Sequence, residues 1–551
     1  MLRSSSTRLL LALFAGISNV VTGAPLEHPD FDVAAALHDH GFQVEQYPDL
    51  VPLANTSSNR ACEIACSALE QHYGADSVDR PTEAAYASFV GAYWSALQSD
   101  VHPSCVFKPA APEAVSVLVL LSRLAQCPFA VKSGGHAAFA GASSIDGGIT
   151  VSFQNLRGVA LSADKKVASV QPGNTWGAVY AALEKDDVAV IGGRMRDIGV
   201  GGLTTGGGIS FFSSLYGLAC DNVVAYDVVS ARGDIITASN TENPDLYWAL
   251  RGGGNNFGIV VNFHLETIPL PGGKMWGGGL LYQGDASLKA AAKAFHATVD
   301  NIARQDHRAG MWLAMTAQNG TKIASVEQYY AEPDGGASPA WAAWDDMPAA
   351  PVADTRQNRT LVGYTTEVQQ SNPDGLRELY YGLSFLGSAE VIADAQAAFF
   401  DEIGALDHVA GLLPVLACQA FTRPILAKMR RNGGNPLGLE AAAAAGRPVY
   451  VMQVAAWWRD RGDDAAVYAV ASRVLTRIKA ASVARGAASD YVYMNYASMF
   501  QDVIGSYGAE NKARLKAVAA RFDPAGVFQK LQPGYFKLDR APVPDSGYFS
   551  R

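Results

Sequence analysis

Short apolar runs separated by glycines characterise the chain from about residue 129 to residue 270. Four runs have the length and β-branched content of strands: Phe129–Lys132, Ile149–Phe153, Val167–Val170 and Val188–Ile191. A cap at Asn174 or Thr175 predicts a helix between the last two, with Val179 in its buried face. Because strands and helices interleave, this pattern predicts an α+β or α/β lobe.

A second lobe is predicted beyond the break at Pro269 to Gly273 and extends to about residue 480. Its strongest late strand is Val449–Trp458. Alternation along that strand places four side chains on one face and Tyr450 on the other: Val451, Gln453, Ala455 and Trp457.

A helix is predicted to follow Gly462-Asp463-Asp464. Its buried positions recur at steps of three and four: Val467, Val470, Ala471, Val474 and Ile478. The last segment, Tyr491 to Leu538, is expected to hold more strand, a basic helix and a Pro-Gly turn.

The first 23 residues have the pattern of a secretory signal. Arg3 and Arg8 precede a short apolar core at Leu9–Ile17, and small residues allow cleavage after Gly23. That core is too short to span a bilayer, and no later segment resembles a spanning helix. We therefore expect a protein that is secreted or lies in an endomembrane lumen.

Length and composition narrow the class of protein. A chain of 551 residues exceeds what one core holds, which supports at least two lobes. Hydrophobic residues at 49% and charged residues at 17% are typical of a well-buried enzyme. The net charge of −9 and the lack of basic runs argue against a nucleic-acid partner.

Glycosylation sequons and cysteines agree with an oxidising compartment. The sequons begin at Asn55, Asn319 and Asn358. A disulfide from Cys62 or Cys66 to Cys105 is expected. The other three cysteines have apolar neighbours and are expected to be buried thiols: Cys127, Cys220 and Cys418.

Two glycine-rich clusters are the most informative sequence. The first is Lys132-Ser133-Gly134-Gly135-His136, and the second runs from Gly192 to Gly208. Such density lets the backbone approach a ligand closely and turn N–H groups towards anionic oxygens such as those of a diphosphate. Either cluster taken alone is explained equally well by tight turns.

Common nucleotide and hydrolase signatures are missing. The chain has no Gly-x-Gly-x-x-Gly at a first strand–helix turn, no P-loop, no His-Glu-x-x-His and no Gly-x-Ser-x-Gly. His38-Asp39-His40 lacks a third ligand nearby, so no metal site is predicted. These absences disfavour a Rossmann dehydrogenase, a P-loop enzyme, a zinc protease and a serine hydrolase.

The motifs resemble the vanillyl-alcohol oxidase superfamily, in its berberine bridge enzyme-like branch. Besides the two glycine clusters, four segments carry the resemblance: Asp221-Asn222-Val223-Val224, Asp245 to Val260, Tyr493-Met494-Asn495-Tyr496, and Asp523-Pro524-x-x-Val527-Phe528. The resemblance implies an α+β, two-lobed PCMH-type fold. In it, residues 24–98 form an N-terminal segment, 99–271 the FAD-binding domain and 272–480 a substrate domain of antiparallel sheet covered by helices. Residues 481–551 return to the FAD lobe.

The resemblance also implies FAD as cofactor, bound covalently through His136. An imidazole nitrogen is a competent nucleophile near neutral pH, and glycines leave room for the flavin ring. The other residues expected to bind the cofactor match the family motifs: Lys132, Ser133, Gly134, Gly135, Gly199, Gly201, Gly202, Gly206, Gly207, Asn495 and Tyr496.

Three residues depart from the family pattern. Met195 stands where many relatives have a second, cysteinyl attachment, so a single link is predicted. Leu203 replaces a histidine found near the flavin pyrimidine edge in many relatives. Ile198 lies where relatives gate oxygen access, which leaves oxidase and dehydrogenase behaviour open.

Candidate catalytic residues come from the later part of the chain. Tyr491 and Tyr493 share a face, and a tyrosinate could accept a substrate proton. Gln453 would be polar on a face directed at the flavin but cannot act as a base. Ordinary core packing explains each of the three at least as well.

The resemblance implies an FAD-linked oxidase of fungal secondary metabolism, of the solanapyrone synthase type. Hydride would pass from a small organic substrate to flavin, and molecular oxygen would reoxidise the flavin. The alternatives are a carbohydrate oxidase and a redox-neutral cyclase in which flavin is structural. The sequence carries no signal for the oligomeric state.

Overall fold

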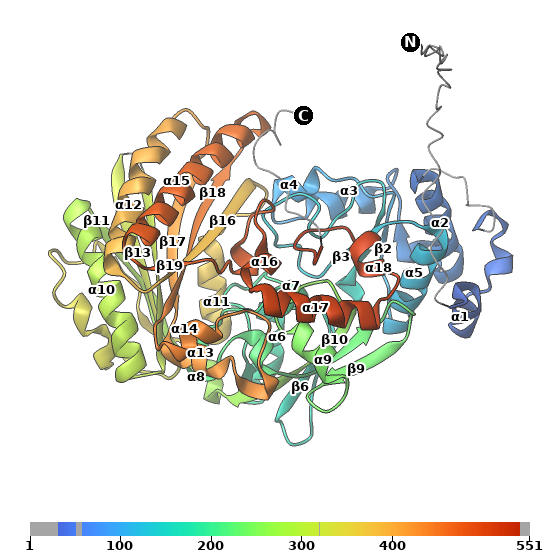
Figure 1. Ribbon diagram of the computed structural model, residues 1–551, viewed down its shortest axis with the longest axis horizontal. Coiled ribbons are helices and arrows are strands. Elements are labelled where there is room, and N and C mark those ends of the chain that lie inside the picture. Colours follow the sequence, from blue (N-terminus) through green and yellow to red (C-terminus); the bar gives the residue numbers. More distant parts are fainter. Residues whose placement is uncertain (1–30, 51–57, 319, 540–551) are drawn as a thin grey trace, which may run out of the picture.

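The computed structural model describes residues 31–50, 58–318 and 320–539. The predicted signal segment 1–23, Asn55 and Asn319 lie outside these ranges. Helices and mostly antiparallel sheets form two lobes side by side, which confirms the predicted fold class (Figure 1).

The first lobe begins with a four-stranded sheet in the order β1 (Val78–Asp79), β2 (Cys105–Phe107), β4 (Ile149–Ser152), β3 (Phe129–Lys132). Strands β2, β4 and β3 are parallel. Helix α5 (Pro112–Ala125) starts with proline at its first turn and buries nearly every side chain, and α2 (Ser58–Tyr73) packs against it. The apolar faces of these elements form one core.

A six-stranded antiparallel sheet completes the first lobe. Its order is β5 (Val159–Leu161), β6 (Val167–Val170), β10 (Ile259–Pro269), β8 (Val223–Val229), β9 (Ile235–Ser239), and β7 (Val188–Val190) pairs with the end of β10. The predicted helix is α6 (Trp176–Glu184), with Thr175 as its N-cap residue and Val179 and Leu183 buried. Helix α9 (Pro244–Leu250) follows β9, and the short α7 (Val200–Thr205) lies in the second glycine cluster.

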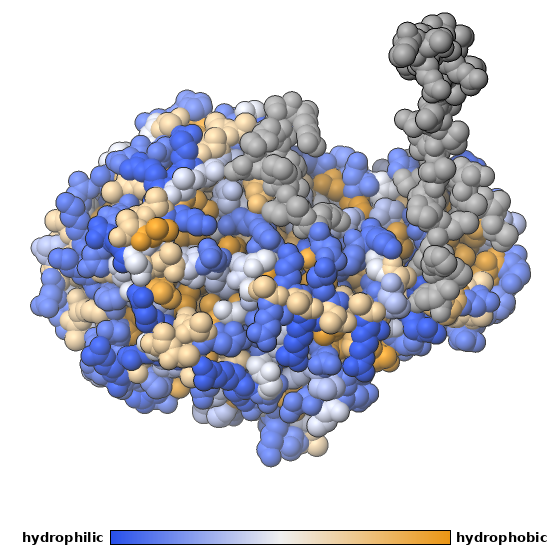
Figure 2. Space-filling view, viewed as in Figure 1, coloured by the Kyte–Doolittle hydropathy of each residue, from blue (hydrophilic) through white to orange (hydrophobic). Residues whose placement is uncertain are grey.

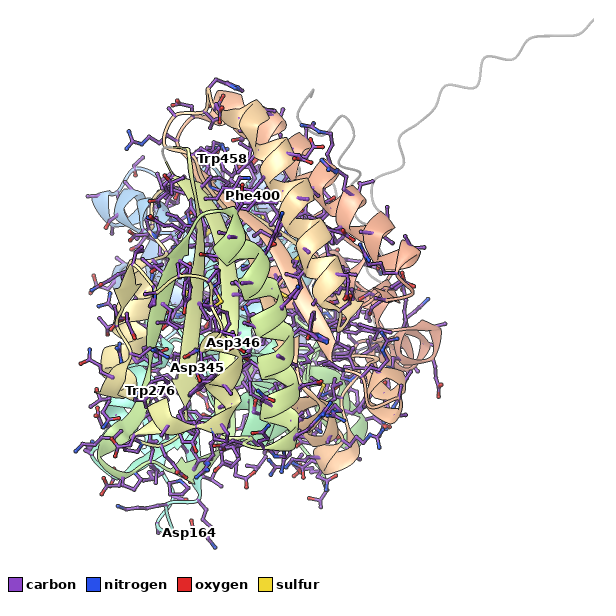
Figure 3. All side chains as sticks on the ribbon, turned by 90° about the vertical axis from the view of Figure 1, so that its left-hand side faces the viewer. Asp164, Trp276, Asp345, Asp346, Phe400 and Trp458 are labelled. Carbon is purple, nitrogen blue, oxygen red and sulfur yellow. A yellow bond between two sulfur atoms is a disulfide. The ribbon has the colours of Figure 1, made fainter. Side chains whose placement is uncertain are left out.

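A nine-stranded antiparallel sheet forms the second lobe. Its order is β14 (Ala353–Asp354), β11 (Lys274–Gln283), β13 (Thr321–Tyr330), β12 (Ala309–Gln318), β17 (Leu413–Phe421), β18 (Val449–Trp458), β16 (Arg377–Leu386), β19 (Ala488–Ser489), with β15 (Gln357–Thr360) beside β11. Helices α10 (Asp285–Arg304), α12 (Ala389–Ile403) and α15 (Asp464–Ala484) cover one face, towards the viewer in Figure 3.

The two faces of β18 have different surroundings, as its alternation predicts. Tyr450 points to the helical layer, where its hydroxyl lies 2.7 Å from Nδ1 of His296 in α10. Ala455 and Trp457 point the other way and pack with Trp94 and Ala138 of the first lobe. Helix α15 buries the five predicted apolar positions against the sheet. The face of the sheet that carries Ala455 and Trp457 therefore covers the first lobe.

The end of the described chain returns to the first lobe. Helix α17 (Ala509–Phe522), the predicted basic helix, packs against α9, and the backbone N–H of Phe129 donates to Leu531 at 2.7 Å. The expectation of more strand after Tyr491 is wrong, since none occurs in residues 491–539. A 3-10 turn at Met494–Tyr496 replaces it, because side chains there bind glycine loops of the first lobe.

The disulfides partly correct the cysteine prediction. Cys66 pairs with Cys105, as one of the predicted alternatives, and Cys220 and Cys418 are buried thiols. The prediction for Cys127 is wrong, because it pairs with Cys62. Cys62 and Cys66 lie one turn apart on α2, so they share a face and reach two neighbouring segments of the lobe.

Hydrophilic residues cover most of the face in Figure 2, where apolar residues are scattered. No helix in the described ranges is long and apolar enough to cross a membrane.

Candidate active site

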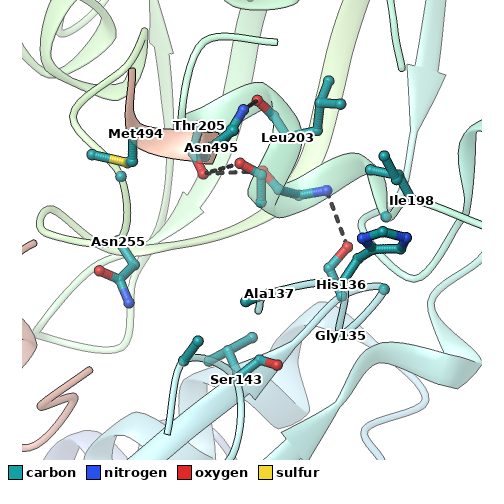
Figure 4. Close-up of a pocket in the computed structure, with 18 of the residues that line it drawn as sticks. Gly135, His136, Ala137, Ser143, Ile198, Leu203, Thr205, Asn255, Met494 and Asn495 are labelled. Atoms are coloured by element: carbon teal, nitrogen blue, oxygen red, sulfur yellow. Dashed lines mark hydrogen bonds between the residues drawn. The ribbon is translucent and has the colours of Figure 1, made fainter. Parts of the chain in front are cut away.

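A cavity of ≈ 320 Å³ lies between the glycine clusters and the C-terminal segment (Figure 4). This volume is typical of small-molecule sites. Ten of the residues predicted from sequence line it: Ser133, Gly134, Gly135, His136, Gly199, Gly201, Gly202, Tyr493, Asn495 and Tyr496. The structure thus brings together segments more than 300 residues apart.

The two glycine clusters touch backbone to backbone. A Cβ added to Gly134 would lie 2.4 Å from the nitrogen of Gly199, and one added to Gly199 would lie 2.2 Å from the nitrogen of Gly134. Ser133 joins the clusters, because its Oγ accepts from Gly201 N–H at 3.0 Å and donates to the Pro172 carbonyl at 2.5 Å. Side chains at either glycine would separate these walls.

His136 lies on this wall with its Nε2 buried and without a hydrogen-bond partner in the described chain. Burial lowers the pKa of its imidazole to about 4, although a backbone hydrogen bond and the charge of Asp197 oppose the shift. The ring is therefore neutral at physiological pH.

Three residues expected to bind the cofactor stand behind the wall instead. The Lys132 ammonium lies over the rings of Phe89 and Tyr93, 4.3 and 4.0 Å from their centroids. Gly206 and Gly207 are covered by Asn495 and Tyr493. None of the three is among the residues that line the cavity, so each supports the loops that do.

Tyr493 and Asn495 anchor the second glycine cluster. The Tyr493 hydroxyl accepts from the N–H groups of Gly208 and Ile209 at 3.0 and 3.1 Å and from Asn495 Nδ2 at 3.0 Å. Asn495 Nδ2 also donates to the Leu203 carbonyl at 3.0 Å. Burial raises the pKa of the Tyr493 hydroxyl. Three donors from the protein surround this oxygen and leave it no free position for a substrate proton, which favours a structural role over that of a base.

The other two catalytic candidates do not line the cavity. Tyr491 stacks on Tyr507 with ring centroids 6.1 Å apart, its hydroxyl has no partner in the described residues, and burial raises its pKa well above the ordinary value. Gln453 lies in mid-strand on β18 with its Oε1 buried and unpartnered. Core packing accounts for Tyr491, and the cavity gives no support to a catalytic role for either.

A polar group that the sequence did not indicate lies on the cavity wall. Arg194 Nη2 donates to Gln419 Oε1 at 2.7 Å and to the Tyr496 hydroxyl at 2.9 Å, and Gln419 Nε2 donates to the same hydroxyl at 2.8 Å. The phenolic oxygen of Tyr496 thus receives two hydrogen bonds. The one available signal was a charged residue directly after Gly192-Gly193 in a glycine-rich block.

The three positions that depart from the family pattern also line the cavity: Met195, Ile198 and Leu203. Ile198 lies beside His136 in Figure 4. No Cys lines this wall. Among the described residues no group of three His, Cys, Asp or Glu side chains could hold a metal ion.

The residues present fit a flavin dinucleotide. Backbone without side chains forms one wall, and a Cβ at Gly202 would meet nothing within 4 Å, so that position opens on empty space. An unpartnered imidazole nitrogen lies at the same wall. Ser133, the surrounding glycines, His136 and Asn495 would hold the cofactor.

Comparison with known proteins agrees with this cavity. A family described as FAD binding domain matches residues 103–239. An FAD-dependent monooxygenase, tpcD of Cochliobolus heterostrophus, is 35% identical over 88% of this chain and 95% of its own. The bifunctional solanapyrone synthase of Alternaria solani is 30% identical over 79% of this chain and 82% of its own.

Solved structures share the fold. The 6-hydroxy-D-nicotine oxidase of Arthrobacter nicotinovorans superposes with a TM-score of 0.67 at 21% identity, covering 84% of this chain and 97% of the other. Berberine bridge enzyme from Eschscholzia californica has a TM-score of 0.67 at 17% identity, covering 87% and 99%. The chain therefore belongs to the fungal FAD-dependent oxidoreductases with the berberine bridge enzyme-like fold.

Proposed function

We propose that this protein is a secreted oxidase of fungal secondary metabolism that holds FAD through a single covalent bond to His136. When bound, FAD accepts a hydride from the substrate and passes the electrons to molecular oxygen. The observation that carries the proposal is the buried His136 Nε2, which has no hydrogen-bond partner in the described residues and lies on a glycine wall that a cofactor would fill. Met195 has no thiolate to form a second bond.

His136 has the state that attachment requires. A neutral imidazole has a free lone pair to attack carbon, and burial keeps this ring neutral above about pH 4. Trp94 stacks on the ring with centroids 3.9 Å apart. Burial therefore keeps the imidazole nucleophilic, and the stack on Trp94 holds the ring in one orientation.

Tyr496 is the best-placed group to take a proton from a substrate hydroxyl. Tyr496 lines the cavity, and its hydroxyl oxygen accepts hydrogen bonds from Arg194 and Gln419. A phenolate formed there would keep both donors, one of them cationic, so its charge would be stabilised in place. Tyr380 lies next to it, edge to face, with ring centroids 6.2 Å apart.

Two disulfides in the first lobe support export through an oxidising compartment. Of the predicted glycosylation sites, Asn358 is exposed on β15, where its amide exchanges hydrogen bonds with Asp334. A glycan at Asn358 stays a prediction.

Acid precipitation of the purified protein tests the attachment. Flavin fluorescence should remain with the polypeptide in wild type and in His264→Ala, a control histidine on β10 paired with Asp227. It should be released from His136→Ala. Release from wild type would refute covalent attachment, and retention by His136→Ala would reveal a second attachment residue.

Oxygen insertion is a second candidate, because several relatives are named FAD-dependent monooxygenases. Turnover under ¹⁸O₂ separates the two: an oxidase releases labelled peroxide and an unlabelled product, whereas a monooxygenase labels the product. A redox-neutral cyclase would convert substrate without oxygen while its flavin stays in one redox state.

A further inference from the structure

Arg194 is a buried cation with unused hydrogen-bonding capacity. It lies on the cavity wall and is 9% exposed. Its Nη2 donates to Gln419 and Tyr496, and the Tyr329 hydroxyl interacts with the guanidinium, but its Nη1 is buried and meets no acceptor within hydrogen-bond geometry in the described residues. A guanidinium presents five N–H donors in a fixed plane. The N–H groups of Nη1 are therefore available to an acceptor on a ligand.

No carboxylate neutralises this charge at close range. Arg194 forms no ion pair within the described ranges, and Trp312, 4.7 Å away, covers only the face of the guanidinium. Glu327 is near enough to interact with it, but burial raises the pKa of that carboxyl to about 7, and the Tyr364 hydroxyl bonds to it at 2.6 Å. A buried charge without a counter-charge lowers the stability of the fold unless a bound ligand supplies the counter-charge.

Two other buried arginines show how this fold satisfies a structural guanidinium. Arg251 pairs with Asp221 at 3.2 Å and donates to four backbone carbonyls. Arg377 pairs with Asp464 and Asp100. Both lie away from the cavity. Arg194 is on the wall and lacks such partners, which is typical of a residue held ready for a ligand.

The surroundings of Arg194 define the ligand. Three aromatic residues interact with it, Trp312, Tyr329 and Tyr496, and Tyr380 lines the same cavity next to Tyr496. Because Trp312 and Gln419 belong to the sheet of the second lobe, Arg194 lies on the cavity wall at the boundary between the two lobes.

We propose that Arg194 binds an oxyanion of the substrate, namely a carboxylate or an ionised enol or phenol on a flat conjugated molecule. This inference rests on the proposed function of the cavity. It places the acidic oxygen of the substrate beside Tyr496 and its ring among the aromatic side chains, so Arg194 selects substrates by charge.

Calorimetric titration of the purified holoenzyme with benzoate tests this, with benzamide as a neutral ligand of the same shape. We expect wild type to bind benzoate at least about tenfold more tightly than benzamide. Arg194→Met should abolish that preference and leave benzamide binding unchanged, and Arg194→Lys should keep part of it. Arg473→Met, a surface arginine paired with Glu402, should behave as wild type.

Equal binding of benzoate and benzamide by wild type, or an undiminished preference in Arg194→Met, would overturn the proposal. The positive charge of Arg194 would also suit the anion of reduced flavin, because Leu203 has no hydrogen-bond donor for that anion. A changed flavin reduction potential in Arg194→Met with unchanged benzoate affinity would assign the charge to flavin and also overturn it. Benzoate binding measured by calorimetry does not require a covalent bond between flavin and protein. Release of flavin in the acid precipitation experiment would therefore contradict the proposed covalent attachment and leave the inference about Arg194 standing.

Discussion

The indole of Trp94 stacks on the imidazole of His136, with ring centroids 3.9 Å apart and planes inclined by 14°. Trp94 also meets Trp457 of β18 edge to face at 6.5 Å. One aromatic side chain thus supports the proposed attachment residue and touches the roof of the cavity.

Removing this stack should impair flavin attachment. Trp94→Ala is expected to lower the free energy of unfolding by about 3 kcal/mol or more and to reduce the flavin retained after acid precipitation, because His136 loses its fixed orientation. Trp94→Phe keeps a ring and should retain most of both. Full flavin content and unchanged melting in Trp94→Ala would show that the stack is incidental.

Tyr496→Phe should slow flavin reduction by about a hundredfold or more, because the proton acceptor is lost while the flavin stays attached. Stopped-flow reduction under anaerobic conditions measures this step, once a substrate is known. Tyr491→Phe is the matched control, because that hydroxyl lies off the cavity and should leave the rate unchanged. Equal rates in wild type and Tyr496→Phe would remove Tyr496 from the chemistry.

Glu378 should make the stability of the protein fall as pH rises. Both its carboxyl oxygens are buried and meet no donor within hydrogen-bond geometry in the described chain. Burial raises the pKa of Glu378 from 4.5 to about 9, although a weak interaction with the Ser95 hydroxyl opposes this shift. The folded state then holds the proton more tightly than the unfolded chain. The contribution of the Glu378 carboxyl to the free energy of unfolding is therefore fully present below about pH 4.5 and is lost progressively as the pH rises to about 9.

Glu378→Gln cannot ionise, so its melting temperature should fall less than that of wild type between pH 5 and about pH 9. Glu390→Gln is a suitable control, because that exposed carboxyl accepts from Ser388, which lowers its pKa. Parallel melting curves for wild type and Glu378→Gln across this range would mean that Glu378 ionises freely in the fold.

Two glycine substitutions should separate folding from cofactor binding. Gly134→Ala forces a methyl group to 2.4 Å from a backbone nitrogen and should destabilise the protein by about 2 kcal/mol or more. Gly202→Ala meets nothing within 4 Å, so the fold should persist while flavin content falls. Thermal melting and flavin absorbance measure the two effects, and normal flavin content in Gly202→Ala would place the cofactor elsewhere.

Local patterns in the sequence determined much of the fold. The strands of the first lobe follow from short apolar runs between glycines. The buried face of α15 and the two faces of β18 follow from periodicities of 3.6 and two residues. Nine of the twelve residues expected to bind the cofactor line the cavity, and the glycines among them do so because they act through their own backbone. A lack of side chains is visible in the sequence itself.

Tertiary structure alone decided the rest. Gln419 and Tyr496 lie 225 and 302 residues from Arg194 along the chain, and they meet because the second lobe roofs the first. Cys127 pairs with Cys62 across 65 residues, and Lys132 faces two rings instead of the cavity. Which way a polar side chain points depends on partners that folding brings from distant segments, and a periodic pattern carries no information about them.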